Sequence, residues 1–187
     1  PGHIHLPADS VALHGKLCIF EDDTYTHLAS LPPDGLVGTS AEPGAIKQLK
    51  TLEETISVNR RNFGNCFAHR AGIWIFDLLS DGRWESREYW DTTLVLRRIA
   101  AELREEPLNQ PEVAYVMDEE SLYYMRSNTH PQLLHALYLA RAEVERIGAR
   151  VGFYLLSDLE RLPDSVKVVI LANAYRLDKR QLKTIQE

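Results

Sequence analysis

The sequence predicts an α/β protein with parallel sheets. Short apolar runs of the kind that form buried strands alternate with longer segments whose apolar residues recur at helical spacing. This alternation occurs twice, before and after the segment Pro107-Leu-Asn-Gln-Pro111. Prolines around polar residues are typical of a linker, so we expect one domain over residues 1–106 and a second over 112–187.

The composition is that of a globular protein of ordinary size. The chain has 187 residues, of which 44% are hydrophobic and 26% charged. A net charge of -6 argues against nucleic acid as the main partner, because phosphate binding needs clustered cations. No stretch approaches the ~20 apolar residues of a membrane span, and no signal peptide opens the chain. We therefore expect neither a nucleic-acid nor a membrane partner, and a cytoplasmic location.

Both ends of the sequence are typical of a piece of a longer protein. The chain opens on Pro1 without a methionine and stops within an amphipathic helix predicted from about Asp178, with no capping residue after it. The cysteines, Cys18 and Cys66, lie among apolar residues and are interpreted as reduced core side chains. Two cysteines alone cannot form a zinc site, and we expect no metal or other cofactor.

The first domain is predicted to begin with an irregular segment, residues 1–15, followed by a strand. The run Leu17-Cys-Ile-Phe20 is typical of a strand buried on both faces, and it leads directly into Glu21, Asp22 and Asp23. Proline and glycine at 31–35 and 41–44 then predict a long loop. Loops of this length commonly carry function or contact a neighbour.

Two helices and a second strand complete the predicted first domain. Thr51 and Glu54 form a capping box that starts a helix running to about His69. A second buried strand over 73–78 is closed by Asp77, and a second helix is expected over 89–105. This order predicts a right-handed unit with parallel strands. The side chains expected to be buried are Leu52, Ile56, Phe63 and Phe67 on the first helix and Leu94, Ile99, Ala100 and Leu103 on the second.

The second domain begins the pattern again. Strands are predicted over 113–117, 151–156 and 166–171, and the helix between the first two starts at Pro131 and ends at Gly148. This β-α-β-β-α order is the first half of a doubly wound, flavodoxin-like sheet, which has about five strands when complete. The apolar stripe of the helix consists of Leu134, Leu137, Ala140, Val144 and Ile147.

Carboxylates at the ends of neighbouring strands are the main candidates for chemistry. Glu21 follows one predicted strand and Asp77 ends the next, with Trp74, Phe76 and Trp84 close by in sequence. Two carboxylates about 5–9 Å apart are what glycoside hydrolysis requires, and aromatic faces pack on sugar rings. A plainer interpretation stays open, in which the acids form a solvated turn and the aromatic residues belong to the core.

Other enzyme classes lack their signatures in this sequence. Motifs of serine hydrolases, dinucleotide-binding proteins, phosphate loops and zinc proteases are absent. Asp118-Glu-Glu120 is placed like the magnesium-binding acids of a receiver domain, but the third strand leads into Asn173 where such a domain has its phosphate-accepting aspartate. An acidic turn is the alternative. We expect the second domain to be an inactive module for packing or assembly.

A series of motifs, taken in order, resembles β-galactosidase-like glycoside hydrolases (family 42 and its relatives). The end of their catalytic TIM barrel, its last two βα units, is similar to Leu13-His-Gly-Lys16, Glu21-Asp-Asp-Thr-Tyr-Thr-His27, Thr51-x-x-Glu-Thr55, Arg60-Arg-Asn-Phe63 and Gly72-Ile-Trp-Ile-Phe-Asp-Leu78. The start of their trimerisation domain, which is amidotransferase-like in fold without amidotransferase chemistry, resembles Glu112–Ser121 and the segment 166–182.

The resemblance implies roles for particular residues. It makes the first predicted strand barrel strand seven, at whose end the family has its nucleophilic glutamate, and Glu21 matches that position. Because the neighbouring acids differ from the family's usual residues, Asp22 and Asp23 stay open as alternative nucleophiles. The acid/base glutamate belongs to the end of strand four, which this chain does not contain. Contacts to the carbohydrate substrate are expected from Asp22, Asp23, Trp74, Asp77 and Trp84.

The parent protein is therefore expected to be a retaining glycosidase that forms a trimer, and this chain alone is expected to be inactive. The alternative is a non-catalytic α/β module for oligomerisation or interaction, with a decayed active site.

Overall fold

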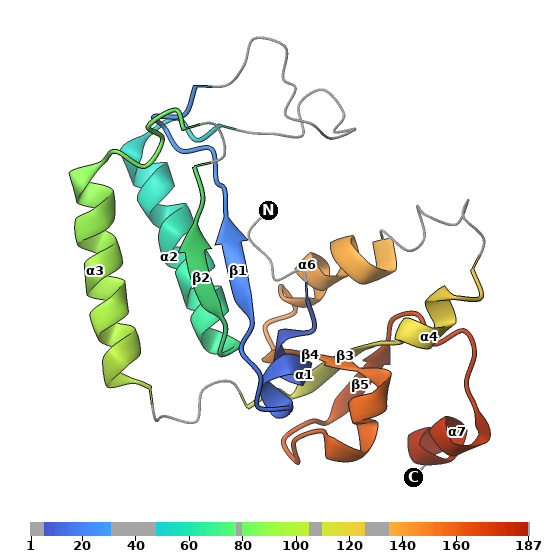
Figure 1. Cartoon of the computed structure of the whole chain (residues 1–187). Helices are drawn as coiled ribbons and strands as arrows, with labels where there is room; N and C mark the ends of the chain where they lie inside the picture. The colour runs from blue at the N-terminus through green and yellow to red at the C-terminus, as the bar shows by residue number, and fades with distance from the viewer. Residues whose placement is uncertain (1–5, 31–47, 78–79, 105–109, 126–134, 187) are drawn as a thin grey trace. The chain divides into compact units, whose positions relative to one another are not determined.

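The computed structural model describes residues 6–30, 48–77, 80–104, 110–125 and 135–186 (Figure 1). These residues divide into two compact units. The first comprises the described parts of 19–67 and 72–106, and the second those of 3–18, 68–71 and 107–187. Both combine helices with a small parallel sheet, so the predicted α/β class is confirmed. The loop expected over 31–44, most of the linker 107–111, and Pro131 lie outside the described residues.

The first unit is a two-stranded parallel sheet with two helices (Figure 1). Strand β1 (Ile19–Asp22) pairs with β2 (Gly72–Ile75), and the connection between them contains α2 (Leu52–Ala68). Helix α3 (Arg87–Glu102) follows β2 and runs alongside α2. This is the predicted order of strand, helix, strand and helix.

Capping side chains set the points at which both helices begin. At the start of α2, the Glu54 N–H donates to Thr51 Oγ1 at 3.1 Å and the Lys50 N–H donates to the Glu54 carboxylate at 2.6 Å. Helix α3 follows Ser86, whose hydroxyl accepts from the Tyr89 N–H at 3.2 Å. The pattern at α2 is the predicted capping box, with its backbone donor one residue earlier than in the standard motif.

The expectation that the strands of the first unit are buried on both faces is wrong. Ile19 is 56% exposed and Trp74 is 44% exposed. Helix α2 lies against one face of the β1–β2 pair (Figure 1). Side chains alternate between the two faces of a strand, so every second residue of β1 and β2 points away from that helix.

The buried side of α3 also differs from the prediction. Leu94, Ile99 and Leu103 are exposed, whereas Ala100 is half-buried as expected. The helix packs beside α2 through a narrower stripe, because within the described unit α2 is the helix next to it. That stripe consists of Tyr89, Thr93, Leu96 and Ala100.

Helix α2 buries polar side chains more deeply than its predicted apolar face. Leu52, Ile56, Phe63 and Phe67 are half-buried. The most deeply buried positions of the helix are Thr55, Asn59 and Cys66.

The second unit contains a three-stranded parallel sheet with the strand order β4-β3-β5. Its strands are β3 (Val113–Met117), which has the predicted bounds, β4 (Val151–Leu155), which ends one residue before the prediction, and β5 (Val168–Leu171), which begins two residues after it. Val113 stands in register with Val151 on one side and with Val168 on the other. Every residue of β3 is buried, which is expected of the central strand in a sheet with covered faces.

Short helical segments accompany this sheet. They are α4 (Glu119–Leu122), the π-helical turn η2 (His135–Leu139), α6 (Ala140–Val144), the 3-10 helix η3 (Leu156–Arg161) and α7 (Lys179–Gln186). From the predicted stripe, Leu137, Ala140 and Val144 pack on the core, Ile147 is exposed, and Leu134 lies outside the described residues. The predicted helix end at Gly148 is wrong, because α6 ends at Val144 with Glu145 as its C-cap; Gly148 has a φ of 81° in the turn that follows.

The prediction of an irregular N-terminal segment is wrong for its described part. Residues Ala8–Leu13 form a helix, α1, which packs against β4. Ala8 and Ser10 are 0% and 2% exposed. The described residues 6–18 and 68–71, which the sequence assigns to the first domain, therefore belong by their contacts to the second unit.

Candidate functional site

The candidate site lies where β1 and β2 end. Their register places Glu21 beside Trp74 and Asp22 beside Ile75. Because side chains alternate along a strand, Glu21 and Asp22 point to opposite faces of the sheet. Glu21 is exposed, whereas Asp22 is only 6% exposed.

Asp22 faces α2 and is held there by hydrogen bonds. Its Oδ2 accepts from Asn62 Nδ2 at 3.0 Å. Its Oδ1 accepts from the Thr24 N–H at 3.1 Å and from the Thr24 hydroxyl at 2.5 Å. Both carboxylate oxygens are thus engaged, and this side chain joins the end of β1 to α2.

Glu21 and Trp74 share the opposite face. Residues in register on two parallel strands lie on the same side, so an exposed carboxylate stands beside a half-exposed indole. The ring of Trp74 lies 5.1 Å from that of Phe76, which extends the aromatic surface. A nucleophilic carboxylate beside an aromatic face can attack and pack against a sugar ring.

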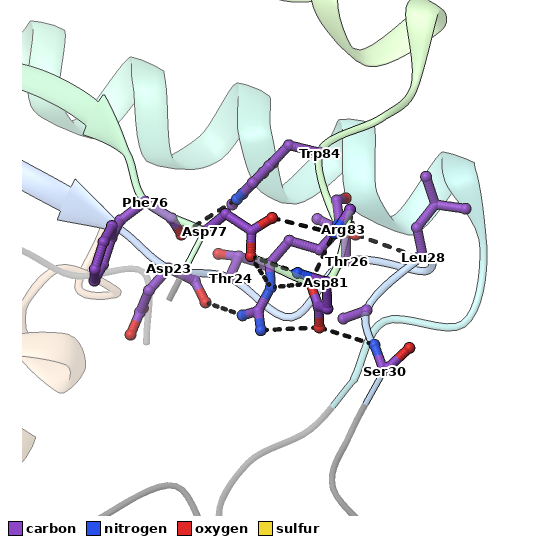
Figure 2. A network of polar contacts seen from close by, with 12 residues as sticks. Asp23, Thr24, Thr26, Leu28, Ser30, Phe76, Asp77, Asp81, Arg83 and Trp84 are labelled. Carbon is purple, nitrogen blue, oxygen red and sulfur yellow. Dashed lines mark hydrogen bonds and ion pairs between the residues drawn. The ribbon is translucent and has the colours of Figure 1, made fainter. Parts of the chain in front are cut away.

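A buried arginine connects the segments that follow the two strands (Figure 2). Arg83 is 1% exposed, and its Nε and Nη2 donate to the two oxygens of Asp81 at 2.9 and 3.1 Å. Its Nε also lies 3.4 Å from Asp77 Oδ1. On the β1 side, Nη1 donates to the Asp23 carbonyl at 3.4 Å, and the guanidinium lies 4.2 Å from the centre of the Tyr25 ring.

Asp77 orders the turn after β2. Its carboxylate accepts from the N–H groups of Asp81 and Gly82, both at 3.2 Å. Gly82 has a φ of 76°, which a residue with a side chain rarely adopts. The hydrogen bond from Arg83 holds the pKa of Asp81 below its ordinary value. Arg83 thus compensates the charges of both acids, and Asp77 supports the loop.

Trp84 lies in the interior of the unit, where its ring is not accessible to a ligand. It is 8% exposed, its Nε1 donates to the Phe76 carbonyl at 3.2 Å (Figure 2), and its ring lies 5.0 Å from that of Tyr89. Asp23, by contrast, is exposed. Among the expected site residues, the accessible ones are therefore Glu21, Asp23 and Trp74, whereas Asp22 and Trp84 are buried.

Sequence reasoning missed Arg83 and Asn62. Arg83 follows the predicted turn directly, but no local pattern distinguishes an arginine that will be buried from one that is solvated. The position of Asn62 could have been anticipated from the sequence. Together with Thr55 and Asn59 it forms a polar stripe at helical spacing on the first predicted helix.

The acids after β3 serve the structure of the second unit. Asp118 accepts from the N–H groups of Glu120 and Ser121 at 3.2 and 3.1 Å and so caps α4. Asn173 accepts from the Asp118 N–H at 2.8 Å and donates to the Asp118 carbonyl at 2.7 Å. Asp118 and Asn173 are 4% and 0% exposed, so they are buried and bind each other at this end of the sheet. This arrangement favours the acidic-turn interpretation over a receiver site.

Comparison with known proteins gives no relative for this chain: no family model, no curated protein and no solved structure matches it. Within the described ranges, no group of three or more histidine, cysteine, aspartate or glutamate residues is placed to hold a metal ion. The helices of the described residues are all too short or too polar to span a bilayer.

Proposed function

We propose that the first unit supplies the nucleophile of a retaining glycosidase, and that Glu21 is this nucleophile. The position of Glu21 carries the proposal, since it is exposed at the end of β1 beside the indole of Trp74. The alternative Asp22 is engaged by Asn62 and Thr24 on the other face. Glu21 also belongs to the strand itself, and pairing with β2 fixes its backbone.

In the proposed reaction, the Glu21 carboxylate attacks the anomeric carbon of the sugar and forms a glycosyl ester. A carboxylic acid from outside this chain protonates the leaving oxygen. The resulting carboxylate then removes a proton from water, which cleaves the ester and restores Glu21. Trp74 packs on the C–H face of the sugar, and Arg83 holds the backbone that follows β1.

Exposed apolar surface supports the idea that this unit is the end of a TIM barrel. Ile19 and Trp74 are exposed on the strands, and Leu94 and Ile99 are exposed on α3. In a TIM barrel, the strand face opposite the helices packs in the barrel interior, and each outer helix has neighbours in a ring. For the second unit, the order β4-β3-β5 is the order in which a flavodoxin-like sheet begins.

The test of Glu21 uses the longer protein that contains these residues together with an acid. Glu21→Gln is expected to lower kcat at least about a thousandfold, because the group that forms the covalent bond is lost. Glu21→Ala should regain turnover with azide, which attacks from the side that the carboxylate occupied. Glu53→Gln, an exposed glutamate of α2, is the matched control. A Glu21→Gln protein whose kcat stays near the wild-type value would exclude Glu21 as the nucleophile. Separately, appreciable galactosidase activity of the 187-residue chain alone would contradict the expectation that this chain is inactive.

Assembly through the second unit is a second candidate function. Val168 and Val169 of β5 are 52% and 44% exposed, and adjacent strand residues point to opposite faces, so both faces of β5 carry exposed valines. Leu182 and Ile185 of α7 are exposed as well. Such apolar surface is typical of a place where another chain or element packs. The partner we expect is a further copy, forming a trimer in the parent protein.

The mass of the longer protein in solution tests assembly. Deleting 112–187 would also remove the packing partners of residues 6–18 and 68–71, which belong to the same unit, so point variants test assembly more directly. Val168→Glu and Val169→Glu are expected to dissociate an oligomer, and Ile147→Glu, an exposed position in the same unit, should leave it intact. An unchanged oligomer in both valine variants, or a monomeric wild type, would count against this function.

A further inference from the structure

Two carboxylates cover the free edge of β4. Among the described residues, β4 pairs with β3 on one side, and the N–H groups directed to its other side need separate acceptors. The Phe153 N–H donates to Asp9 Oδ2 at 2.7 Å, and the Leu155 N–H donates to Asp158 Oδ2 at 3.1 Å. Residues two apart on a strand direct their N–H groups to the same side, so both acids act on one edge.

Each of these carboxylates also contacts a histidine. His69 Nδ1 lies 2.8 Å from Asp9 Oδ2, and His14 Nε2 lies 2.8 Å from Asp158 Oδ1. Asp158 and His69 are 0% and 6% exposed. Asp9 lies in the first turn of α1 and His14 follows its last residue, so the two pairs hold both ends of this helix. Within each pair, one member lies on α1 or at its end and the other lies outside it.

We propose that the two histidine–aspartate pairs form a pH-sensitive cap that holds α1 over the edge of β4. Histidine is the side chain whose charge ordinarily changes between pH 5 and 8. A charged histidine donates a charge-assisted hydrogen bond to an aspartate. A neutral histidine can still donate one hydrogen bond, but without the charge that strengthens it. The cap is therefore stronger when the histidines are charged.

Other ionisable side chains lie close to the two histidines. Burial raises the pKa of Tyr154 on β4, and the charges of Asp9 and Asp158 raise it further, so its hydroxyl stays neutral. Arg70 and Lys16 are close in sequence to the two histidines. Among the described residues around α1, His14 and His69 are the side chains of the type whose charge ordinarily changes between pH 5 and 8.

The cap has a consequence for association. An uncovered strand edge offers its N–H and C=O groups to an extended segment of another chain. Asp9, on α1, occupies the Phe153 N–H, and Asp158, which caps the start of η3 and contacts His14 at the end of α1, occupies the Leu155 N–H. Weakening the pairs at higher pH therefore increases the fraction of molecules whose β4 edge is open. This device is independent of any glycosidase activity.

Amide hydrogen exchange, measured by NMR on the whole 187-residue chain, tests the proposal. After correction for the intrinsic pH dependence of exchange, protection of the Phe153 and Leu155 amides is expected to fall about fivefold between pH 5.5 and 8. Protection of Tyr115 and Val116 in the central strand should not change. His69→Gln should remove the pH dependence at Phe153, and His14→Gln should remove it at Leu155. His135→Gln, an exposed histidine of the same unit, is the matched control and should behave as wild type.

Two results would overturn the proposal. One is wild-type protection of Phe153 and Leu155 that stays constant between pH 5.5 and 8. The other is a pH dependence that persists in both His14→Gln and His69→Gln at the level of His135→Gln. The wild-type profile decides the question even where the buried His69 cannot be replaced without unfolding the chain.

Discussion

Asp22 accepts a hydrogen bond from Asn62 of α2 at 3.0 Å, while the residue before it, Glu21, is exposed on the opposite face of β1 beside Trp74. Two adjacent acids thus have different surroundings. Asp22 stabilises the packing of β1 on α2, and Glu21 is accessible to a ligand. This difference supports the choice of Glu21 over Asp22 as the proposed nucleophile.

The two acids should respond differently to loss of charge. Asp22→Asn is expected to lower the free energy of unfolding by about 2 kcal/mol, because asparagine offers one neutral acceptor oxygen in place of two charged ones, so that either Asn62 or Thr24 loses its acceptor. Glu21→Gln should change it by less than about 0.5 kcal/mol, since its side chain is exposed. Urea unfolding followed by circular dichroism measures both. Equal effects would show that the surroundings of the two acids are not as described.

Arg83 should be far more sensitive to substitution than an arginine at the surface. Arg83→Met is expected to destabilise the protein by about 3 kcal/mol, because Asp81 and Asp77 lose their buried counter-charge. Arg87, 90% exposed and paired with Asp91 at 3.7 Å, is the control, and Arg87→Met should change stability by less than about 0.5 kcal/mol. Chemical unfolding of both variants measures the two changes in stability. If Arg83→Met destabilised the protein no more than Arg87→Met, the loops after β1 and β2 would not depend on Arg83.

Asp81 should contribute to the acid sensitivity of the protein. The hydrogen bond from Arg83 lowers the pKa of Asp81 in the folded state, so the unfolded chain takes up the proton more readily. The resulting stabilisation is complete above the ordinary aspartate range and is lost as the pH falls through the lowered pKa. The urea midpoint between pH 5 and pH 2.5 should therefore fall less steeply for Asp81→Asn than for wild type. Asp91→Asn, at a position 65% exposed, should keep the wild-type slope.

Ser121 should hold the loops after β3 and β5 together. Its hydroxyl donates to Asp118 Oδ2 at 2.5 Å and accepts from the N–H groups of Tyr175 and Arg176, both at 3.1 Å. Ser121→Ala is expected to lower the free energy of unfolding by about 2 kcal/mol, because these groups lose a buried partner. It should also speed amide exchange at Tyr175 and Arg176. Ser157→Ala, at an exposed serine of η3, should do neither.

Elements with strong local signals could be predicted from the sequence. Helix α2 begins at its capping box, and β3 occupies the residues expected of it, because capping residues and continuous apolar runs act over a few neighbouring positions. Helix α1 could not be predicted in this way. Its six residues are too few to show a period, and its burial depends on β4, more than a hundred residues away.

The faces of the predicted helices were harder to assign than their positions. On α3, the apolar residues Leu94, Ile99 and Leu103 are spread around the helix, and the sequence alone does not say which of them a neighbour will cover. On α2, the deeply buried Thr55 and Asn59 are polar, and partners outside the helix contact them: the Thr55 hydroxyl lies 3.0 Å from His27 Nδ1, and Asn59 Nδ2 donates to Thr93 Oγ1 at 3.1 Å.

The sequence by itself determined the α/β class, the order of the strands along the chain and the three acids at the end of β1, because these follow from local periodicity and residue type. Only the tertiary structure decided that Glu21 is accessible while Asp22 is bound to Asn62, that Arg83 is buried between two loops, and that α1 and His69 join β4. Burial and pairing arise from contacts between residues far apart in the chain, and no local pattern encodes them.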